Sequence, residues 1–188
     1  MRPEMTLDTA ALLCLMNRYL VPGYLYRLSM LEIQKLAYFL QAAGQGLRLH
    51  FTKHDYGPYA DNLRKVLERI DGHFIEGYGD GDGTNSPESP IKLLADAADE
   101  AETILHKDEQ AQERFDEVST LIEGFETPYG MELLATVHWV ATKECADARE
   151  DVELAIGQVH AWNDRKRQLM QPAHVKAAWN TLHAKNWL

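Results

Sequence analysis

The stretch HDYGPYADNLRKVLERIDGHF, residues 54–74, decides the fold that we predict for this 188-residue chain. Its apolar residues recur with the spacing of one helical face, at Leu63, Val66, Leu67 and Ile70. We expect a helix over 58–71, entered through Gly57 and Pro58, because proline suits the first helical position, where its missing N–H would be unpaired anyway. The outer face of this helix would carry Arg64, Lys65 and Arg69.

The segments on either side complete the pattern of a winged helix-turn-helix. A helix is expected around 33–40, ending near Gly44, since glycine favours the conformation that follows many helices. The residues LRLHFTK (47–53) alternate apolar and polar side chains, as a half-buried strand does. Residues 73–94 have apolar ends around a centre rich in Gly, Asp, Asn, Ser and Pro, which predicts a β-hairpin with a long acidic loop. The helix at 58–71 takes the position of the recognition helix.

Helical spacing continues through the rest of the chain. A first helix is expected over 12–19, with Thr6 as its cap. An acidic helix is expected directly after the hairpin, and further helices over 115–122, 152–159 and 175–182. GMELLATVHWVATKE (130–144) is apolar on most sides, which predicts the most buried helix. We therefore predict a mainly α fold, with a single helical domain over 1–188 that has a small β-hairpin and a winged helix-turn-helix-like core. Its winged-helix-like part spans about 25–94 and its C-terminal helical part about 95–188.

The formal net charge of -10 comes from the middle of the chain. Residues 1–70 hold nine basic and six acidic residues, and residues 133–188 hold seven and six. Residues 71–132 hold three basic and seventeen acidic residues, a balance of -14. Such a segment is either a solvated face that keeps a protein soluble or a surface for a cationic partner.

No motif in the sequence predicts catalysis. There is no glycine-rich phosphate loop, no nucleophile elbow and no histidine or cysteine pattern of a metal site. His138, beside Trp139 in the most buried helix, is interpreted as a core histidine rather than a general base. We expect no catalytic residue, no metal and no cofactor, and hence a protein that is not an enzyme. The two distant cysteines, Cys14 and Cys145, and the lack of a membrane span or leader predict a cytoplasmic protein.

The basic helix could mark a winged-helix DNA-binding transcriptional regulator, but its charges argue against this. Asp61 lies four residues before Lys65, and Arg64 lies four before Glu68, so local ion pairs use much of the positive charge. The wing should clasp the DNA backbone, yet its acids outnumber its single cation, Lys92. These acids are Glu76, Asp80, Asp82 and Glu88. We therefore interpret the helix as scaffold and expect no direct binding of nucleic acid, with the regulator kept as the alternative.

Four long motifs carry a resemblance to a known family. They are KLAYF (35–39), YGPYADNL (56–63), GHFIEGYGDG (72–81) and ELLATVHWVA (132–141). With the sequence around them, from about Arg2 to Trp187, the chain resembles the C-terminal toxin-binding domain of DarG, the macrodomain antitoxin of the DarT–DarG toxin–antitoxin system. The resemblance implies an antitoxin domain whose partner is a DarT-like toxin, an NAD-dependent ADP-ribosyltransferase that modifies thymidine in single-stranded DNA. The macrodomain that removes this modification in the family is not expected in this chain.

Charge and resemblance together predict how the toxin is inhibited. An acidic surface with interleaved aromatic rings resembles a single strand with its phosphates and stacked bases, so it could occupy the single-stranded-DNA site of the toxin. Alternatively, the tyrosines simply cover the edge of the core with their hydroxyls in water. The predicted partner-binding residues are Tyr56, Tyr59, Tyr78, Asp80, Asp82, Glu88, Asp96, Asp99 and Glu100. The oligomeric state is left open.

Overall fold

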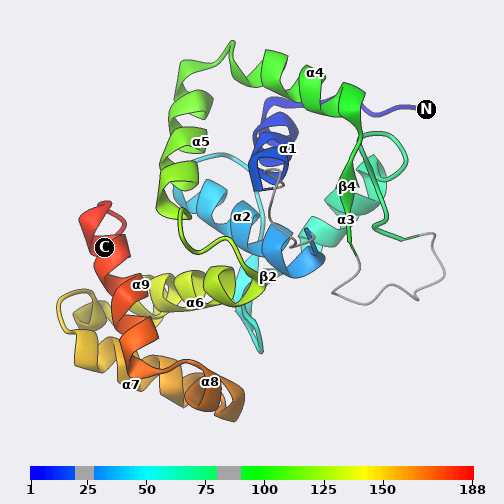
Figure 1. Ribbon diagram of the computed structural model, residues 1–188. Helices are drawn as coiled ribbons and strands as arrows, with labels where there is room; N and C mark the ends of the chain where they lie inside the picture. Colours follow the sequence, from blue (N-terminus) through cyan, green and yellow to red (C-terminus); the bar gives the residue numbers. More distant parts are fainter. Residues whose placement is uncertain (20–27, 80–89) are drawn as a thin grey trace. The chain divides into compact units, whose positions relative to one another are not determined.

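The computed structural model describes residues 1–19, 28–79 and 90–188, which form two compact units (Figure 1). The first unit contains Met1–Thr52 and Tyr59–Thr120, and the second contains Lys53–Pro58 and Leu121–Leu188. Helices dominate both units, so the prediction of a mainly α fold is confirmed. Within the described residues, no helix combines the length and the apolar character needed to cross a membrane.

The first unit is built around α1 (Leu7–Tyr19) and α2 (Met30–Ala42). The predicted cap of the first helix is present, because the N–H of Thr9 donates to Thr6 Oγ1 at 3.2 Å. Helix α2 has a cap that was not predicted: the N–H of Ser29 donates to Glu32 Oε2 at 2.7 Å. Residues 9–16 of α1 are buried on every side. The remaining helices of the unit are α3 (Asp61–Ile70), α4 (Ala95–Leu105) and α5 (Glu109–Leu121).

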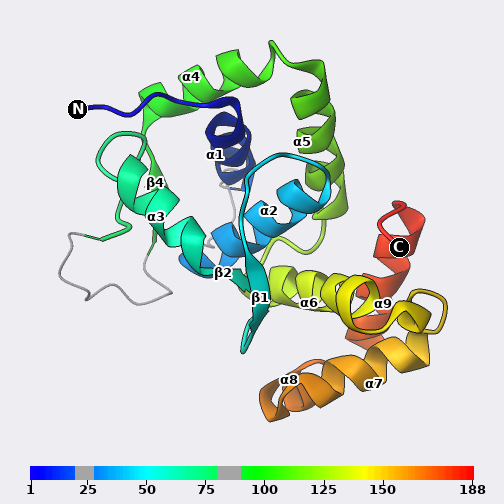
Figure 2. The same cartoon turned by 180° about the vertical axis from the view of Figure 1, so that it is seen from behind.

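Helices α4 and α5 wrap the outside of this unit. Figures 1 and 2 show α4 running across the end of α1 and α5 turning down beside α2. Small side chains allow the close approach of α4, because Ala97, Ala101 and Leu105 are its buried residues. Both helices were expected from the sequence, but as part of the C-terminal helical part. In the structure they belong to the first unit.

Two hairpins connect the helices. Strands β3 (Ile75–Glu76) and β4 (Lys92–Leu93) pair antiparallel, with Ile75 opposite Leu93, so the small predicted hairpin is present. Its loop, residues 80–89, lies outside the described residues, and the winged-helix arrangement stays a prediction.

The segment before α3 differs from the sequence prediction. Strand β1 (Phe51–His54) pairs with β2 (Gly57–Ala60), so Pro58 lies in a strand, and the helix begins at Asp61 instead of residue 58. The physical reason is a tertiary contact: the buried side chain of Gln34 accepts from the N–H of Ala60 at 2.9 Å and donates to its carbonyl at 2.9 Å. This pair of hydrogen bonds holds Ala60 extended, where the sequence alone favours a first helical turn.

The second unit has α6 (Pro128–Trp139) as its most buried helix, as predicted. The helix continues into a π-helical turn (Val140–Glu144), followed by a 3-10 turn (Ala146–Arg149). Helices α7 (Val152–Trp162), α8 (Asp164–Leu169) and α9 (Pro172–Ala184) complete the unit, and α9 packs against both α6 and α7. Of these, α8 was not expected from the sequence.

Candidate partner-binding surfaces

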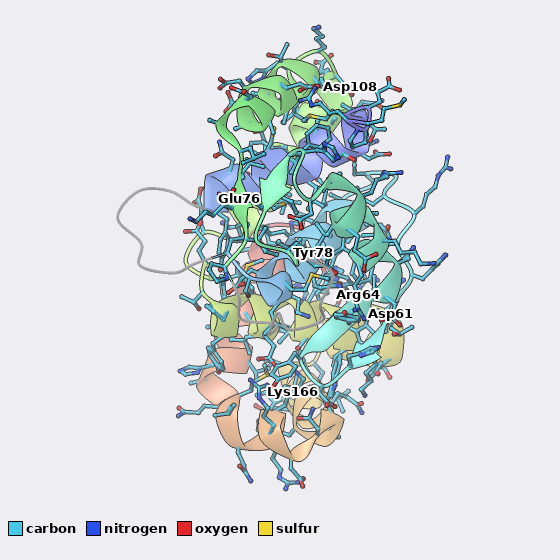
Figure 3. All side chains as sticks on the ribbon, turned by 90° about the vertical axis from the view of Figure 1, so that its right-hand side faces the viewer. Asp61, Arg64, Glu76, Tyr78, Asp108 and Lys166 are labelled. Carbon is cyan, nitrogen blue, oxygen red and sulfur yellow. The ribbon has the colours of Figure 1, made fainter. Side chains whose placement is uncertain are left out.

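Helices α4 and α5 carry a dense set of carboxylates in the first unit. We call this set the acidic face; two cations, Lys107 and Arg114, accompany it between residues 95 and 121. Seven of its nine members are exposed, and Glu100 and Asp108 are half-buried. Figure 3 shows Asp108 between the two helices, at one end of the unit. The acidic face consists of Asp96, Asp99, Glu100, Glu102, Asp108, Glu109, Glu113, Asp116 and Glu117.

Among the residues that the structure describes, few cations neutralise the acidic face. Glu100 forms an ion pair with Arg2, whose guanidinium also lies 4.9 Å from the centre of the Phe74 ring. Arg114 turns to the interior instead, where its Nη1 donates to Gln45 Oε1 at 3.1 Å. Like charges therefore stand one helical turn apart, where each such pair destabilises a helix by about 0.2–0.5 kcal/mol.

The predicted residues Tyr59 and Tyr78 meet at α3. The Arg64 guanidinium donates a hydrogen bond to Tyr78, which is the largest of the causes that raise the pKa of Arg64 (Figure 3). Burial raises the pKa of Tyr59, and the nearby Arg64 partly offsets that rise. The backbone next to Tyr78 is also held, because the N–H of Gly79 donates to Oδ2 of Asp71, the residue after α3, at 3.3 Å. Arg64 is exposed, but it is engaged by a tyrosine of the same chain, which agrees with the scaffold interpretation of this helix.

Tyr56 belongs to the second unit, where it lies at the tip of the β1–β2 hairpin. It is 45% exposed, and the Arg165 guanidinium lies 4.4 Å from the centre of its ring. The backbone of the tip is clamped as well: Trp162 Nε1 donates to the carbonyl of His54 at 2.8 Å, and Asn163 Nδ2 donates to the carbonyl of Asp55 at 3.1 Å.

A buried ion network lies behind this tip. Glu132 on α6, whose side chain is 7% exposed, accepts from Lys166 Nζ at 2.7 Å and from Arg165 Nη1 and Nη2 at 2.5 and 3.2 Å. Lys166 is fully buried, and its Nζ also donates to Thr136 Oγ1 at 3.2 Å. Burial lowers the pKa of Lys166, and Glu132 opposes that effect. Buried charges are retained when they are paired and hydrogen-bonded, as these are.

Sequence reasoning missed this network, although one signal could have revealed it. Glu132 interrupts the most apolar segment of the chain, and a carboxylate in such a helix needs a buried cation. Which cation supplies the pairing depends on the packing of α6 against α8, and α8 was itself not predicted.

Two other expectations concern single residues and metals. His138 is a buried core histidine whose pKa is lowered to about 4 by burial and then by Arg149 and Lys143. Within residues 1–19, 28–79 and 90–188, no group of three or more His, Cys, Asp or Glu side chains could hold a metal ion.

The predicted partner-binding residues therefore fall into three groups. Tyr59, Tyr78 and the acids of α4 (Asp96, Asp99 and Glu100) lie in the first unit, and Tyr56 lies in the second. Asp80, Asp82 and Glu88 lie outside the described residues. Their role in partner binding stays a prediction.

Known proteins similar to this chain are named for chemistry on DNA. No protein-family model matches the chain. A protein of Thermus aquaticus named DNA ADP-ribosyl glycohydrolase is 42% identical over 181 residues, which is 96% of this chain and 48% of that protein. Proteins of the same name from Mycobacterium tuberculosis and Mycobacterium bovis are 37% identical over 185 residues, covering 93% of this chain and 52% of each.

These similarities correct one expectation and support another. The expectation that the chain is not an enzyme is wrong, because the proteins that match nearly all of it at 37–42% identity are named as glycohydrolases, which are enzymes. The chain spans about half the length of the curated relatives it matches. Its homologues are thus DNA ADP-ribosyl glycohydrolases, which fits the DarG family without assigning the chain to a particular domain of those proteins.

Proposed function

We propose that the chain is part of a protein of the DNA ADP-ribosyl glycohydrolase type and that, within it, the chain binds and inhibits a DarT-like DNA ADP-ribosyltransferase toxin. In this proposal the acidic face mimics a DNA strand and occupies the single-stranded-DNA site of the toxin. The observation that carries the proposal is the acidic face itself, with nine carboxylates and two cations on two consecutive helices and the turn between them.

The acidic face is unfavourable for the isolated chain, which supports a functional reason for it. On α5, Glu113 lies one helical turn from Glu109, Asp116 and Glu117, and on α4, Asp99 lies one turn from Asp96 and Glu102. A solvated face needs no such arrangement, because interspersed charges of both signs with a modest net excess also keep a protein soluble, and they stabilise the helix through i,i+4 pairs.

An enzyme that grips a DNA strand needs a cationic groove, and the acidic face complements such a groove. Phosphate charges dominate the affinity of proteins for nucleic acids, so a protein that replaces the strand must offer comparable negative charge. Complementary charge also speeds the encounter of two proteins and weakens as the salt concentration rises.

The test is binding of this chain to a catalytically inactive variant of the toxin, measured at low and high salt. The chain should bind the toxin and should compete with single-stranded DNA for it. The double variant Asp96→Lys/Asp99→Lys should bind at least about tenfold more weakly at low salt, since close charge pairs across interfaces are worth about 1.5 kcal/mol or more. The difference should shrink at high salt.

A matched control separates the acidic face from net charge. Glu150→Lys/Glu153→Lys makes the same change in net charge at exposed positions of the second unit, and should leave the affinity within about threefold of wild type at moderate salt. Equal weakening by both double variants would remove the acidic face from the interface, and failure of the wild-type chain to bind the toxin would overturn the proposed function.

Two further assays address the other activities. Incubation with ADP-ribosylated single-stranded DNA measures whether the chain itself releases ADP-ribose, as the name of its relatives implies for those proteins. A mobility shift with duplex DNA at low salt tests the alternative of a winged-helix regulator. Lys65 and Arg69 are exposed on α3, so their replacement by glutamine would abolish a shift that is due to that helix.

A further inference from the structure

The tip of the β1–β2 hairpin is held in place more firmly than an exposed turn requires. We define the tip clamp as the tip, Lys53–Pro58, together with Trp162, Asn163 and Arg165. Asn163 has two roles in it, because its Oδ1 accepts from the N–H of Lys166 at 2.8 Å, which caps α8, while its Nδ2 holds the carbonyl of Asp55. The tip and the start of α8 are therefore fixed by the same side chain.

The aromatic rings of the tip clamp are also fixed by cations. Trp162 has Lys53 Nζ at 4.5 Å and Lys166 Nζ at 5.1 Å from its ring centre. The guanidinium of Arg165 lies over the ring of Tyr56, and its orientation is set by two hydrogen bonds to the buried carboxylate of Glu132. A planar guanidinium bound at two points to a carboxylate has little freedom to turn.

The charges of the tip clamp do not favour a phosphate group. Lys53 forms an ion pair with Glu144 at 2.9 Å, and Arg165 pairs with Glu132. Next to the clamp on α8, Arg167 pairs with Asp164 at 2.7 Å. A nucleotide or single-stranded DNA would have to break these pairs to gain phosphate contacts. A protein partner needs no such change, and tyrosine and arginine are enriched among the residues that dominate protein interfaces.

We propose that Tyr56 is a preformed anchor that inserts into a pocket of a protein partner, and that Arg165 is the positioning residue that holds its ring. The partner is the toxin of the proposed function, on which this inference rests. An aromatic side chain already held in its bound orientation loses less conformational entropy on binding, so the fixed ring strengthens the complex without any new contact.

The test compares variants of the whole chain for binding to the inactive toxin. Tyr56→Ala should bind at least about 30-fold more weakly, mainly through faster dissociation, as expected for a dominant interface residue. Tyr56→Phe keeps the ring and should stay within about threefold of wild type. Arg165→Lys keeps the charge but loses the planar, two-point contact, and should weaken binding by about 3- to 10-fold.

Two comparisons separate positioning from a general structural effect. If Arg165 acts through Tyr56, the double variant Tyr56→Ala/Arg165→Lys binds no more weakly than Tyr56→Ala alone. The matched control is Leu169→Ala, because Leu169 is 49% exposed in the same unit, and it should leave the affinity within about threefold of wild type. Circular dichroism of each variant verifies that it is folded.

Each outcome has one meaning for the inference. Unchanged affinity of Tyr56→Ala, in a wild-type chain that binds the toxin, would overturn the anchor and leave the proposed function intact. Additive losses in the double variant would overturn the positioning role of Arg165. A loss in Leu169→Ala as large as that in Tyr56→Ala would show that the tip is not a distinct anchor. Failure of the wild-type chain to bind would remove the proposed function and this inference together.

Discussion

The buried network of Glu132, Arg165 and Lys166 predicts an asymmetry between two substitutions that remove one charge each. Glu132→Gln keeps the shape of the side chain and removes the negative charge. It leaves the fully buried ammonium of Lys166 without its hydrogen-bonded counter-charge, and only the weaker effect of Asp55 remains, whereas Arg165, whose side chain is 38% exposed, can turn to water. Lys166→Met removes the buried cation and leaves Glu132 with both hydrogen bonds from Arg165.

The magnitudes follow from what each variant leaves behind. Removing one partner of a buried pair costs about 3–5 kcal/mol, and because glutamine still accepts hydrogen bonds, we expect Glu132→Gln to lower the free energy of unfolding by about 3 kcal/mol. Lys166→Met also removes one partner, but Glu132 keeps its two hydrogen bonds from Arg165 and no buried charge is left unpaired, so this variant should stay within about 1 kcal/mol of wild type. The double variant Glu132→Gln/Lys166→Met should recover most of the stability that Glu132→Gln loses, which corresponds to a coupling energy of at least about 2 kcal/mol between the two positions.

The same network predicts a pH dependence. The folded state holds the pKa of Lys166 below the value of 10.5 that it has when unfolded, so at a pH between the two values the unfolded state binds more protons. Stability therefore rises with pH across that window, because folding releases this proton, and it levels off once the unfolded chain has also lost it. In Glu132→Gln the opposing effect of the carboxylate is gone, so the pKa of Lys166 falls further, and the window widens towards neutral pH.

The assay uses a property of the sequence. All four tryptophans lie in the second unit, so their fluorescence during urea unfolding reports on that unit. Equal losses of stability in Glu132→Gln and Lys166→Met, or a loss below about 1 kcal/mol in Glu132→Gln, would refute this description of the network. The tryptophans are Trp139, Trp162, Trp179 and Trp187.

Three further predictions concern charge, pH and backbone packing. Glu113→Gln should raise the free energy of unfolding by about 1 kcal/mol at low salt, because it removes repulsion from three carboxylates one turn away on α5; unfolding followed by circular dichroism should show the gain disappearing at about 1 M salt. The folded state holds the pKa of His138 at about 4, below its ordinary 6.5, so the stability of the second unit should fall by up to about 3 kcal/mol as the pH drops through that window. His138→Gln should flatten this part of the profile measured by tryptophan fluorescence, and an unchanged slope would assign it to other groups. Gly130→Ala would place its Cβ 2.5 Å from the carbonyl oxygen of Phe125 and should destabilise the second unit by about 2–3 kcal/mol. Its control, Gly157→Ala, meets nothing within 4 Å in a helix and should stabilise by about 0.5–1 kcal/mol; equal effects of the two alanines on the urea midpoint would contradict the packing at Gly130.

Most helices of this chain could be predicted from local features of the sequence. The first helix was recognised from Leu12, Leu15 and Met16 with Thr6 before them, and the structure has α1 at Leu7–Tyr19, with Thr6 bound to the N–H of Thr9. The last helix was expected over 175–182, and the structure has α9 at Pro172–Ala184, with a proline at its start. Helical spacing and caps act within a few residues, so a single sequence contains them.

The acidic character of α4 and α5 was also a property of the sequence. The charges of side chains do not depend on the fold, and the buried alanines of α4 leave its acids on the opposite side. Which of the predicted tyrosines lie together did depend on the fold: Tyr59 and Tyr78 meet at Arg64, while Tyr56 belongs to the other unit.

The sequence by itself thus determined the helical class, the positions of most helices and the location of the excess negative charge. The tertiary structure alone decided where helix α3 begins and what the hairpin tip contacts. Gln34 holds Ala60, and Gln41 in the same way bonds both the N–H and the carbonyl of Leu49, at 2.8 and 2.9 Å. Glu132 likewise finds Lys166 across 34 residues. A buried polar group must be paired, but its partner is chosen by the packing of distant segments, and no local pattern records that choice.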